Sequence, residues 1–190
     1  MLPVADAVQV LRGKCLHTVA GREFYAPCCR FVHRLARGDF MQYCSACTDA
    51  VAHIRGGVDA PGLSGKVCFF QECGRVLVVA ELSGLPADSR TGFFGLHIHG
   101  GKACTGEGFS ATEGHYNPAE KMHPMHAGDL PPLLLCRGGA YLAVRTDRFT
   151  VEDIIGRTVV VHSDPDDFPS QPAGNAGKKI ACGVIHKRRV

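Results

Sequence analysis

Two histidines stand two residues apart in an apolar stretch of this 190-residue chain. The stretch, residues 93–99, is rich in β-forming residues and predicts a strand. Because side chains alternate between the two faces of a strand, His97 and His99 would project from the same face. Two imidazoles on one rigid face form half of a transition-metal site. A strand with two hydrogen-bonded structural histidines would have the same spacing, so the pair alone does not establish a metal site.

More side chains of metal-binding type follow this pair. They are His115, His123, His126, Asp129 and His162. Residues 100–132, which contain four of them, have no strand pattern and are rich in glycine, proline and histidine. A loop of this length in a compact domain is usually functional. We therefore expect the loop to carry part of a metal site.

After residue 50, most of the segments outside this loop have the residue pattern of short β-strands. They are expected at residues 66–72, 75–82, 133–136, 140–145, 158–162 and 180–185. Cys73-Gly74 and Gly138-Gly139 predict two hairpin turns, and Thr150 to Asp153 predicts a capped turn. A second loop, rich in proline, glycine and aspartate, separates the last two strands. Short strands with two long loops are typical of an all-β antiparallel sandwich or barrel.

In this order the motifs resemble those of the copper/zinc superoxide dismutase family, over roughly residues 50–186. They are Gly-Leu-His-Ile-His-Gly at 95–100, Gly-His-Tyr-Asn-Pro at 114–118 and Gly-Asn-Ala-Gly-Lys-Lys-Ile-Ala-Cys-Gly at 174–183. The resemblance implies an all-β fold, an eight-stranded Greek-key β-barrel with its metals outside the barrel under two long loops. Only Pro124 and Met125 separate His123 from His126. In this short zinc loop the chain resembles a bacterial-like member of the family.

The resemblance also implies a ligand set for each metal. Copper would be bound by His97, His99, His115 and His162, and zinc by His115, His123, His126 and Asp129. His115 would bridge the two metals. Four neutral imidazoles suit both Cu(II) and Cu(I). Three nitrogens and one carboxylate form the closed tetrahedral set of a structural zinc site.

Four further residues match family positions. Asp166 matches the aspartate that links a copper histidine to a zinc histidine, and Cys104 and Cys182 match the intrasubunit disulfide. Lys179 stands where the family has an arginine beside the copper. Lysine keeps the positive charge but lacks the planar fork of donors. His115 and Lys179 are the expected catalytic residues.

The implied function is superoxide dismutation, in which Cu(II)/Cu(I) cycling converts superoxide to dioxygen and hydrogen peroxide. The alternative is a related copper- and zinc-binding protein with little catalytic turnover. Lys179 and the short connection between His123 and His126 favour that alternative. The complete set of four copper histidines argues against it.

The first 48 residues differ from the rest of the chain. They contain five of the ten cysteines, and residues 28–36 predict a short helix. Cys44 and Cys47 form a Cys-x-x-Cys pair, which fits a redox dithiol, half of a zinc site or free thiols. We expect residues 1–48 to be a cysteine-rich extension that is poorly ordered or a start-site artefact, with Met41 as the alternative start. Residues 49–190 form the dismutase-like domain.

The charge distribution and the hydropathy of the chain limit the kinds of binding partner that we expect. The formal net charge is +3, and its excess lies in residues 1–48, whereas residues 49–190 carry equal numbers of basic and acidic residues. Nucleic-acid binding is therefore not expected. Nor is a membrane span, because no apolar run is long enough. Without a signal-like N-terminus, a cytoplasmic location is expected. Superoxide is the expected small-molecule partner, and a homodimer is left open.

Overall fold

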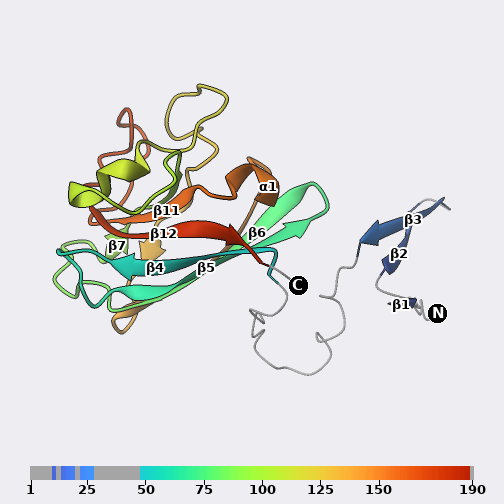
Figure 1. Cartoon of the computed structure of the whole chain (residues 1–190), viewed down its shortest axis with the longest axis horizontal. Coiled ribbons are helices and arrows are strands. Elements are labelled where there is room, and N and C mark those ends of the chain that lie inside the picture. The colour runs from blue at the N-terminus through green and yellow to red at the C-terminus, as the bar shows by residue number, and fades with distance from the viewer. Residues whose placement is uncertain (1–9, 12–13, 20–21, 28–47, 189–190) are drawn as a thin grey trace, which may run out of the picture. The chain divides into compact units, whose positions relative to one another are not determined.

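The computed structural model describes residues 10–11, 14–19, 22–27 and 48–188, and divides the chain into two compact units, residues 1–47 and 48–190 (Figure 1). In the first unit, β1 (Val10–Leu11), β2 (Lys14–Val19) and β3 (Arg22–Pro27) form an antiparallel sheet in that order. These three strands were not predicted from the sequence. The expected helix at 28–36 and the Cys44–Cys47 pair lie outside the described residues.

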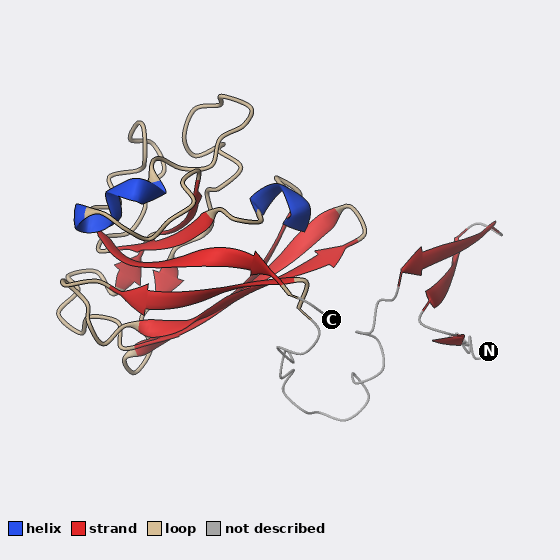
Figure 2. Ribbon diagram, viewed as in Figure 1, coloured by secondary structure: helices blue, strands red, loops and turns tan. Residues whose placement is uncertain are grey.

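The second unit is almost entirely strand and loop (Figure 2). Its strands are β4 (Ala50–Gly56), β5 (Ser64–Glu72), β6 (Arg75–Ser83), β7 (Phe93–Phe94), β8 (Leu96–His99), β9 (Leu133–Leu134), β10 (Gly139–Thr146), β11 (Thr158–His162) and β12 (Lys179–Lys187). Two short helices, η3 (Glu107–Thr112) and α1 (Val151–Ile154), interrupt the loops. No helix in the part of the chain that the structure describes is long and apolar enough to cross a membrane.

The strands of this unit form one curled antiparallel sheet that a small strand pair closes. The sheet runs in the order β10-β6-β5-β4-β12-β11-β8. Its two edge strands are β8 and β10. The short strand β7 leads directly into β8, and the short strand β9 leads into β10. Strands β7 and β9 pair with each other. The two edges of the sheet are therefore joined through β7 and β9. With β7 and β8 counted as one interrupted strand, the unit has the eight strands of the barrel that the family resemblance implies.

Alternation along the strands explains where the core lies. In β4, Ala50, Ala52 and Ile54 are buried, whereas His53 and Arg55 are exposed. Along β5 and β6 the register keeps bulky residues opposite one another, such as Phe69 opposite Val78. The 66–72 and 75–82 strands and their turn are confirmed by β5 and β6. Strand β4 was missed.

The expected single strand over residues 93–99 was wrong in one respect, because Gly95 divides it. The Gly95 amide donates to Asp164 O at 2.8 Å, and Gly95 O accepts from the His162 amide at 2.9 Å. A side chain on Gly95 would meet Ala176 Cβ at 3.1 Å and His162 Cβ at 3.2 Å. The chain therefore leaves the β7–β9 pair at Gly95 and enters the main sheet as β8.

The second expected hairpin was also only partly right. Cys136 and Gly139 do form a tight turn, with backbone hydrogen bonds of 2.7 and 3.0 Å. Beyond that turn the strands separate, because β9 pairs with β7 and β10 pairs with β6. The capped turn is confirmed, since Thr150 and Asp153 form a reciprocal capping box at the start of α1.

Two long loops carry the residues of interest, and they lie on the same side of the sheet (Figure 1). The first long loop, residues 100–132, joins β8 to β9, and the second long loop, residues 163–178, joins β11 to β12. A disulfide between Cys104 and Cys182 fastens the first long loop to β12. The cysteine pair that the resemblance suggested is thus the bonded pair.

We expect removal of this disulfide to destabilise the protein strongly. The bridge spans 78 positions, for which the chain-entropy model gives about 4–5 kcal/mol. Cys104→Ser with Cys182→Ser should lower the free energy of unfolding by about that amount in denaturant titrations. Cys136→Ser, which removes an exposed free thiol, is the control. Equal stability of the double variant and the control would contradict the prediction.

Candidate metal centre

Strand β8 places the first two histidines. It pairs with β11 on one side, His97 opposite Val160 and His99 opposite Thr158. On its other side, isolated bridges join His97 to Asp129 and His99 to His115. Leu96 and Ile98 alternate with the histidines and enter the core. The apolar face of β8 is thus anchored in the barrel, and its histidine face is covered by the first long loop.

Four imidazoles meet at this covered face. His97, His99, His115 and His162 each offer a ring nitrogen, and these four atoms lie within 4.8 Å of one another. His99 Nε2 and His162 Nε2 are 3.2 Å apart. We call these four residues the four-histidine cluster. Three of its members lie on β8 and β11, so sheet hydrogen bonds fix their backbones.

A second group of donors shares His115 with the first. His115, His123, His126 and Asp129 offer three nitrogens and one carboxylate oxygen within 4.8 Å of one another. Asp129 Oδ1 lies 2.7 Å from His115 Nδ1, and Asp129 Oδ2 lies 3.1 Å from His123 Nδ1. We call this group the histidine–aspartate cluster. It belongs entirely to the first long loop.

Buried nitrogens without hydrogen bonds point into both clusters. Within the part of the chain that the structure describes, His97 Nδ1, His115 Nε2, His123 Nδ1 and His126 Nδ1 are buried and make none. A buried unpaired polar atom is costly. Coordination of a metal ion would satisfy all four. The donor sets fit a copper ion bound by imidazoles and a tetrahedral zinc ion bound by nitrogen and carboxylate.

Three of the imidazoles, those of His97, His99 and His162, are also in the protonation state that metals require. Burial, reinforced by neighbouring histidines, lowers the pKa of His99 to about 2 and that of His162 to about 3. Burial likewise lowers the pKa of His97, although its hydrogen bond to Asp166 opposes the shift. These rings are therefore neutral at physiological pH, and neutral imidazole is the form that coordinates a metal.

Comparison with known proteins identifies the family. The profile described as copper/zinc superoxide dismutase (SODC) matches residues 63–185. Cu-Zn superoxide dismutase 1 of Aquifex aeolicus (strain VF5) is 35% identical over 136 residues, which are 64% of this chain and 79% of that protein. Cu-Zn superoxide dismutase 2 of the same organism is 35% identical over 136 residues, 64% of this chain and 78% of that protein. The chain belongs to the copper/zinc superoxide dismutase family.

Asp166 contacts one histidine of each cluster. Its Oδ2 lies 2.9 Å from His97 Nε2 and its Oδ1 lies 2.9 Å from His123 Nε2. Burial would raise the pKa of Asp166, but the hydrogen bonds from the two histidines outweigh burial and hold it below its ordinary range. As a carboxylate, Asp166 fixes the N–H of each ring, so the opposite nitrogen of each ring faces its cluster.

Lys179 is the first residue of β12 and lies beside the four-histidine cluster, with His162 as its register partner. Its Nζ donates to Thr112 Oγ1 at 2.8 Å and to Glu113 O at 2.7 Å. His99 Nδ1 donates to the same Glu113 carbonyl at 2.9 Å. One carbonyl of the first long loop therefore accepts hydrogen bonds from both a cluster histidine and Lys179.

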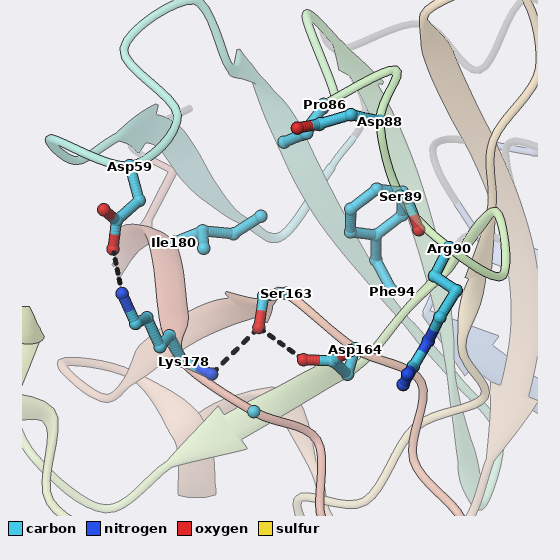
Figure 3. A pocket seen from close by; sticks show the side chains of 11 residues that line it. Asp59, Pro86, Asp88, Ser89, Arg90, Phe94, Ser163, Asp164, Lys178 and Ile180 are labelled. Atoms are coloured by element: carbon cyan, nitrogen blue, oxygen red, sulfur yellow. Dashed lines mark hydrogen bonds and ion pairs between the residues drawn. The ribbon is translucent and has the colours of Figure 1, made fainter.

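One surface hollow, shown in Figure 3, is lined by residues that belong to neither cluster. Its volume is about 490 Å³, and charged groups of both signs line it, including Asp59, Asp164 and Lys178. Lys178 Nζ lies 3.5 Å from Asp59 Oδ2, and Ser163 Oγ donates to Asp164 Oδ2 at 2.7 Å. Four of its lining residues, Ser163, Asp164, Gly177 and Lys178, belong to the second long loop.

Several residues that hold the site together were not predicted from the sequence. Thr112 and Glu113 fix Lys179. Gln171 Nε2 donates to His123 O at 2.7 Å, and Gln171 Oε1 accepts from the His123 amide at 3.1 Å. Arg148 bonds to the first long loop. Most of these contacts involve main-chain groups, which every residue has, so no pattern of side-chain types could have revealed them.

Proposed function

We propose that this chain is a superoxide dismutase. Two superoxide anions and two protons would give one dioxygen and one hydrogen peroxide, as one superoxide loses an electron and the other gains it. The observation that carries the proposal is the four-histidine cluster that shares His115 with the histidine–aspartate cluster, in a chain that belongs to this family. Copper and zinc are its cofactors.

We assign copper to the four-histidine cluster, His97, His99, His115 and His162. Four neutral nitrogens tolerate both oxidation states of copper, and copper bound there supplies the one-electron chemistry. We assign zinc to the histidine–aspartate cluster, His115, His123, His126 and Asp129, because a closed set of three nitrogens and one oxygen is typical of structural zinc. Support for both comes from the buried unpaired nitrogens that face the clusters.

The remaining roles follow from the positions of the side chains. Lys179 is exposed enough to meet solvent and carries a positive charge beside the four-histidine cluster, so it would attract and hold the superoxide anion. His115 belongs to both clusters, and its Nε2 makes no hydrogen bond to the described residues. That nitrogen can take up and return a proton during turnover. Asp166 keeps His97 and His123 in the required tautomers.

Replacement of Asp129 should remove zinc selectively. Asp129→Ala deletes the only oxygen donor of the histidine–aspartate cluster. Loss of a residue that only hydrogen-bonds a metal ligand lowers metal affinity by up to about a hundredfold. Because Asp129 is itself a ligand in this assignment, we expect zinc affinity to fall by at least that much. The melting temperature should fall with it, because bound metal stabilises the folded state. Zinc analysis after dialysis and thermal scans measure both. Asp147→Ala, at an exposed position, is the control, and unchanged zinc content in Asp129→Ala would refute the assignment.

The function is tested by a comparison of metal-free, zinc-only and copper-zinc forms of the full chain. Only the form with copper should remove superoxide catalytically. If the copper-zinc form binds both metals but removes superoxide no faster than the zinc-only form, the proposal is contradicted. The chain would then be a metal-binding relative of the dismutases with little catalytic turnover.

We propose that residues 49–190 carry the activity alone and that residues 1–48 are an extension. The match to the family begins at residue 63, and both clusters lie beyond residue 96. A chain shortened to begin at Met41 should bind copper and zinc and remove superoxide at the full-length rate. Metal analysis and superoxide decay measure this, and loss of either property would show that the extension contributes to the site.

For location and partners we propose a cytoplasmic enzyme that acts on superoxide and binds neither nucleic acid nor membranes, with a homodimer as the candidate assembly. The equal numbers of basic and acidic residues in 49–190 support the absence of nucleic-acid binding. Cell fractionation and light scattering of the purified protein test the location and the assembly.

A further inference from the structure

One arginine from outside the two long loops is bonded to the loop segment that carries zinc donors. Arg148 Nη1 donates to Pro124 O at 3.0 Å, to His126 O at 3.2 Å and to Asp129 O at 3.3 Å. Two of these three carbonyls belong to residues whose side chains are in the histidine–aspartate cluster. A single guanidinium nitrogen is thus hydrogen-bonded to the main chain of two of the four residues in that cluster.

The backbone around these donors is anchored mainly at Gly128, whose carbonyl accepts from the Ile98 amide at 2.9 Å and whose amide donates to Tyr116 O at 2.8 Å. Just before Gly128 there is one turn bond, Met125 N to Met122 O at 2.8 Å, and Asp129 N donates to His126 O at 3.3 Å. In this described part of the chain, no strand or helix lies between residue 113 and residue 132. Three carbonyl oxygens that face one point repel one another unless a donor lies among them. A cationic donor forms stronger hydrogen bonds than a neutral one, so Arg148 can offset that repulsion.

The chain around Arg148 is itself firmly placed. Arg148 follows the end of β10 and precedes α1, and its neighbour Phe149 is buried in the core. The Arg148 amide donates to Thr146 Oγ1 at 3.2 Å, and Thr150 caps α1 two residues later. Arg148 therefore connects the first long loop to a fixed corner of the barrel. Gln171 performs the corresponding task for His123 from the second long loop.

We propose that Arg148 is a positioning residue for the histidine–aspartate cluster, which holds the backbone of His126 and Asp129 in ligand geometry before the metal binds. This inference rests on the proposed zinc site. It makes zinc affinity depend on a side chain that does not itself touch the metal. The four-histidine cluster should be affected less, because none of the three carbonyls belongs to one of its members. It is connected to this backbone through Asp129, which contacts the shared His115 and pairs with His97.

The test uses Co(II) as a probe for the zinc site, titrated into the metal-free full chain and followed by its visible absorption bands. Arg148→Ala should weaken Co(II) binding by about ten- to a hundredfold, the range seen when a partner that supports metal ligands is lost. Arg148→Lys keeps the charge with a shorter reach and should recover part of the affinity. Arg145→Ala is the control, because it removes an equal charge nearby from a side chain bonded to Glu72.

Copper binding gives the second readout. Arg148→Ala should lose much less affinity for copper at the four-histidine cluster than for Co(II), which separates a local effect from general unfolding. Equal Co(II) affinity in Arg148→Ala and the unsubstituted chain would overturn the proposal, as would an equal loss in Arg145→Ala. If Arg148→Ala fails to fold, Arg148→Lys decides, and full Co(II) affinity there with the unsubstituted absorption spectrum overturns the proposal. Failure of the unsubstituted chain to bind Co(II) would instead contradict the proposed zinc site.

Discussion

His162→Ala should reduce superoxide removal to the level of the copper-free protein while zinc stays bound. His162 supplies one of four nitrogens of the four-histidine cluster and is not part of the histidine–aspartate cluster. Its Nε2 faces His99 Nε2 at 3.2 Å, so its loss opens one side of the copper site. Metal analysis and superoxide decay on the same preparation measure both effects.

His186→Ala is the matched control, since His186 is an exposed histidine on β12 outside both clusters. It should retain copper, zinc and the full rate. Full activity in His162→Ala would refute the copper assignment. Loss of zinc together with activity would mean that the two clusters do not fold independently of each other.

Substitutions of Lys179 should change the rate according to charge and donor geometry. An ammonium has three N–H donors, and Lys179 uses two of them on Thr112 and Glu113. One remains for the substrate. Lys179→Arg adds donors in a planar fork and should raise the rate severalfold, because one better charge-assisted hydrogen bond contributes on the order of 1 kcal/mol. Lys179→Glu should slow the enzyme and reverse its dependence on ionic strength.

The pH profile separates lysine from arginine at this position. Burial lowers the pKa of Lys179 from its ordinary value. The positive charge is present below the lowered pKa and is lost as pH rises through it, so the rate should fall at alkaline pH earlier than for an ordinary lysine. Lys179→Arg should keep its rate to higher pH, because arginine stays protonated. An unchanged rate, salt response and pH profile in Lys179→Glu would mean that this side chain does not face the substrate.

The sequence predicted the strands whose residues alternate clearly or are strongly β-forming. Strand β11 was expected at residues 158–162 and has those bounds, because its valines are β-branched and buried. Strand β4 was missed because Ala50 and Ala52 have weak strand propensity, although Ala50, Ala52 and Ile54 occur at a period of two. The break at Gly95 depends on contacts with Asp164 and Ala176, which are far away in sequence.

In the site too, some residues could be predicted from the sequence and others could not. Histidine and aspartate side chains at family spacing could be chosen from the sequence because metals select side-chain types. Their supports could not, because Arg148, Gln171 and Glu113 act on or through main-chain groups whose positions only the folded loops determine. The disulfide required the family pattern, since ten cysteines leave many pairings open.

The most direct measurement is the stopped-flow decay of superoxide in the presence of the full chain loaded with one copper and one zinc, with dioxygen and hydrogen peroxide both quantified. We predict that each chain removes many superoxide anions and that the two products appear in equal amounts. Consumption that stops after about one superoxide per copper, or peroxide formed without dioxygen, would contradict a dismutase.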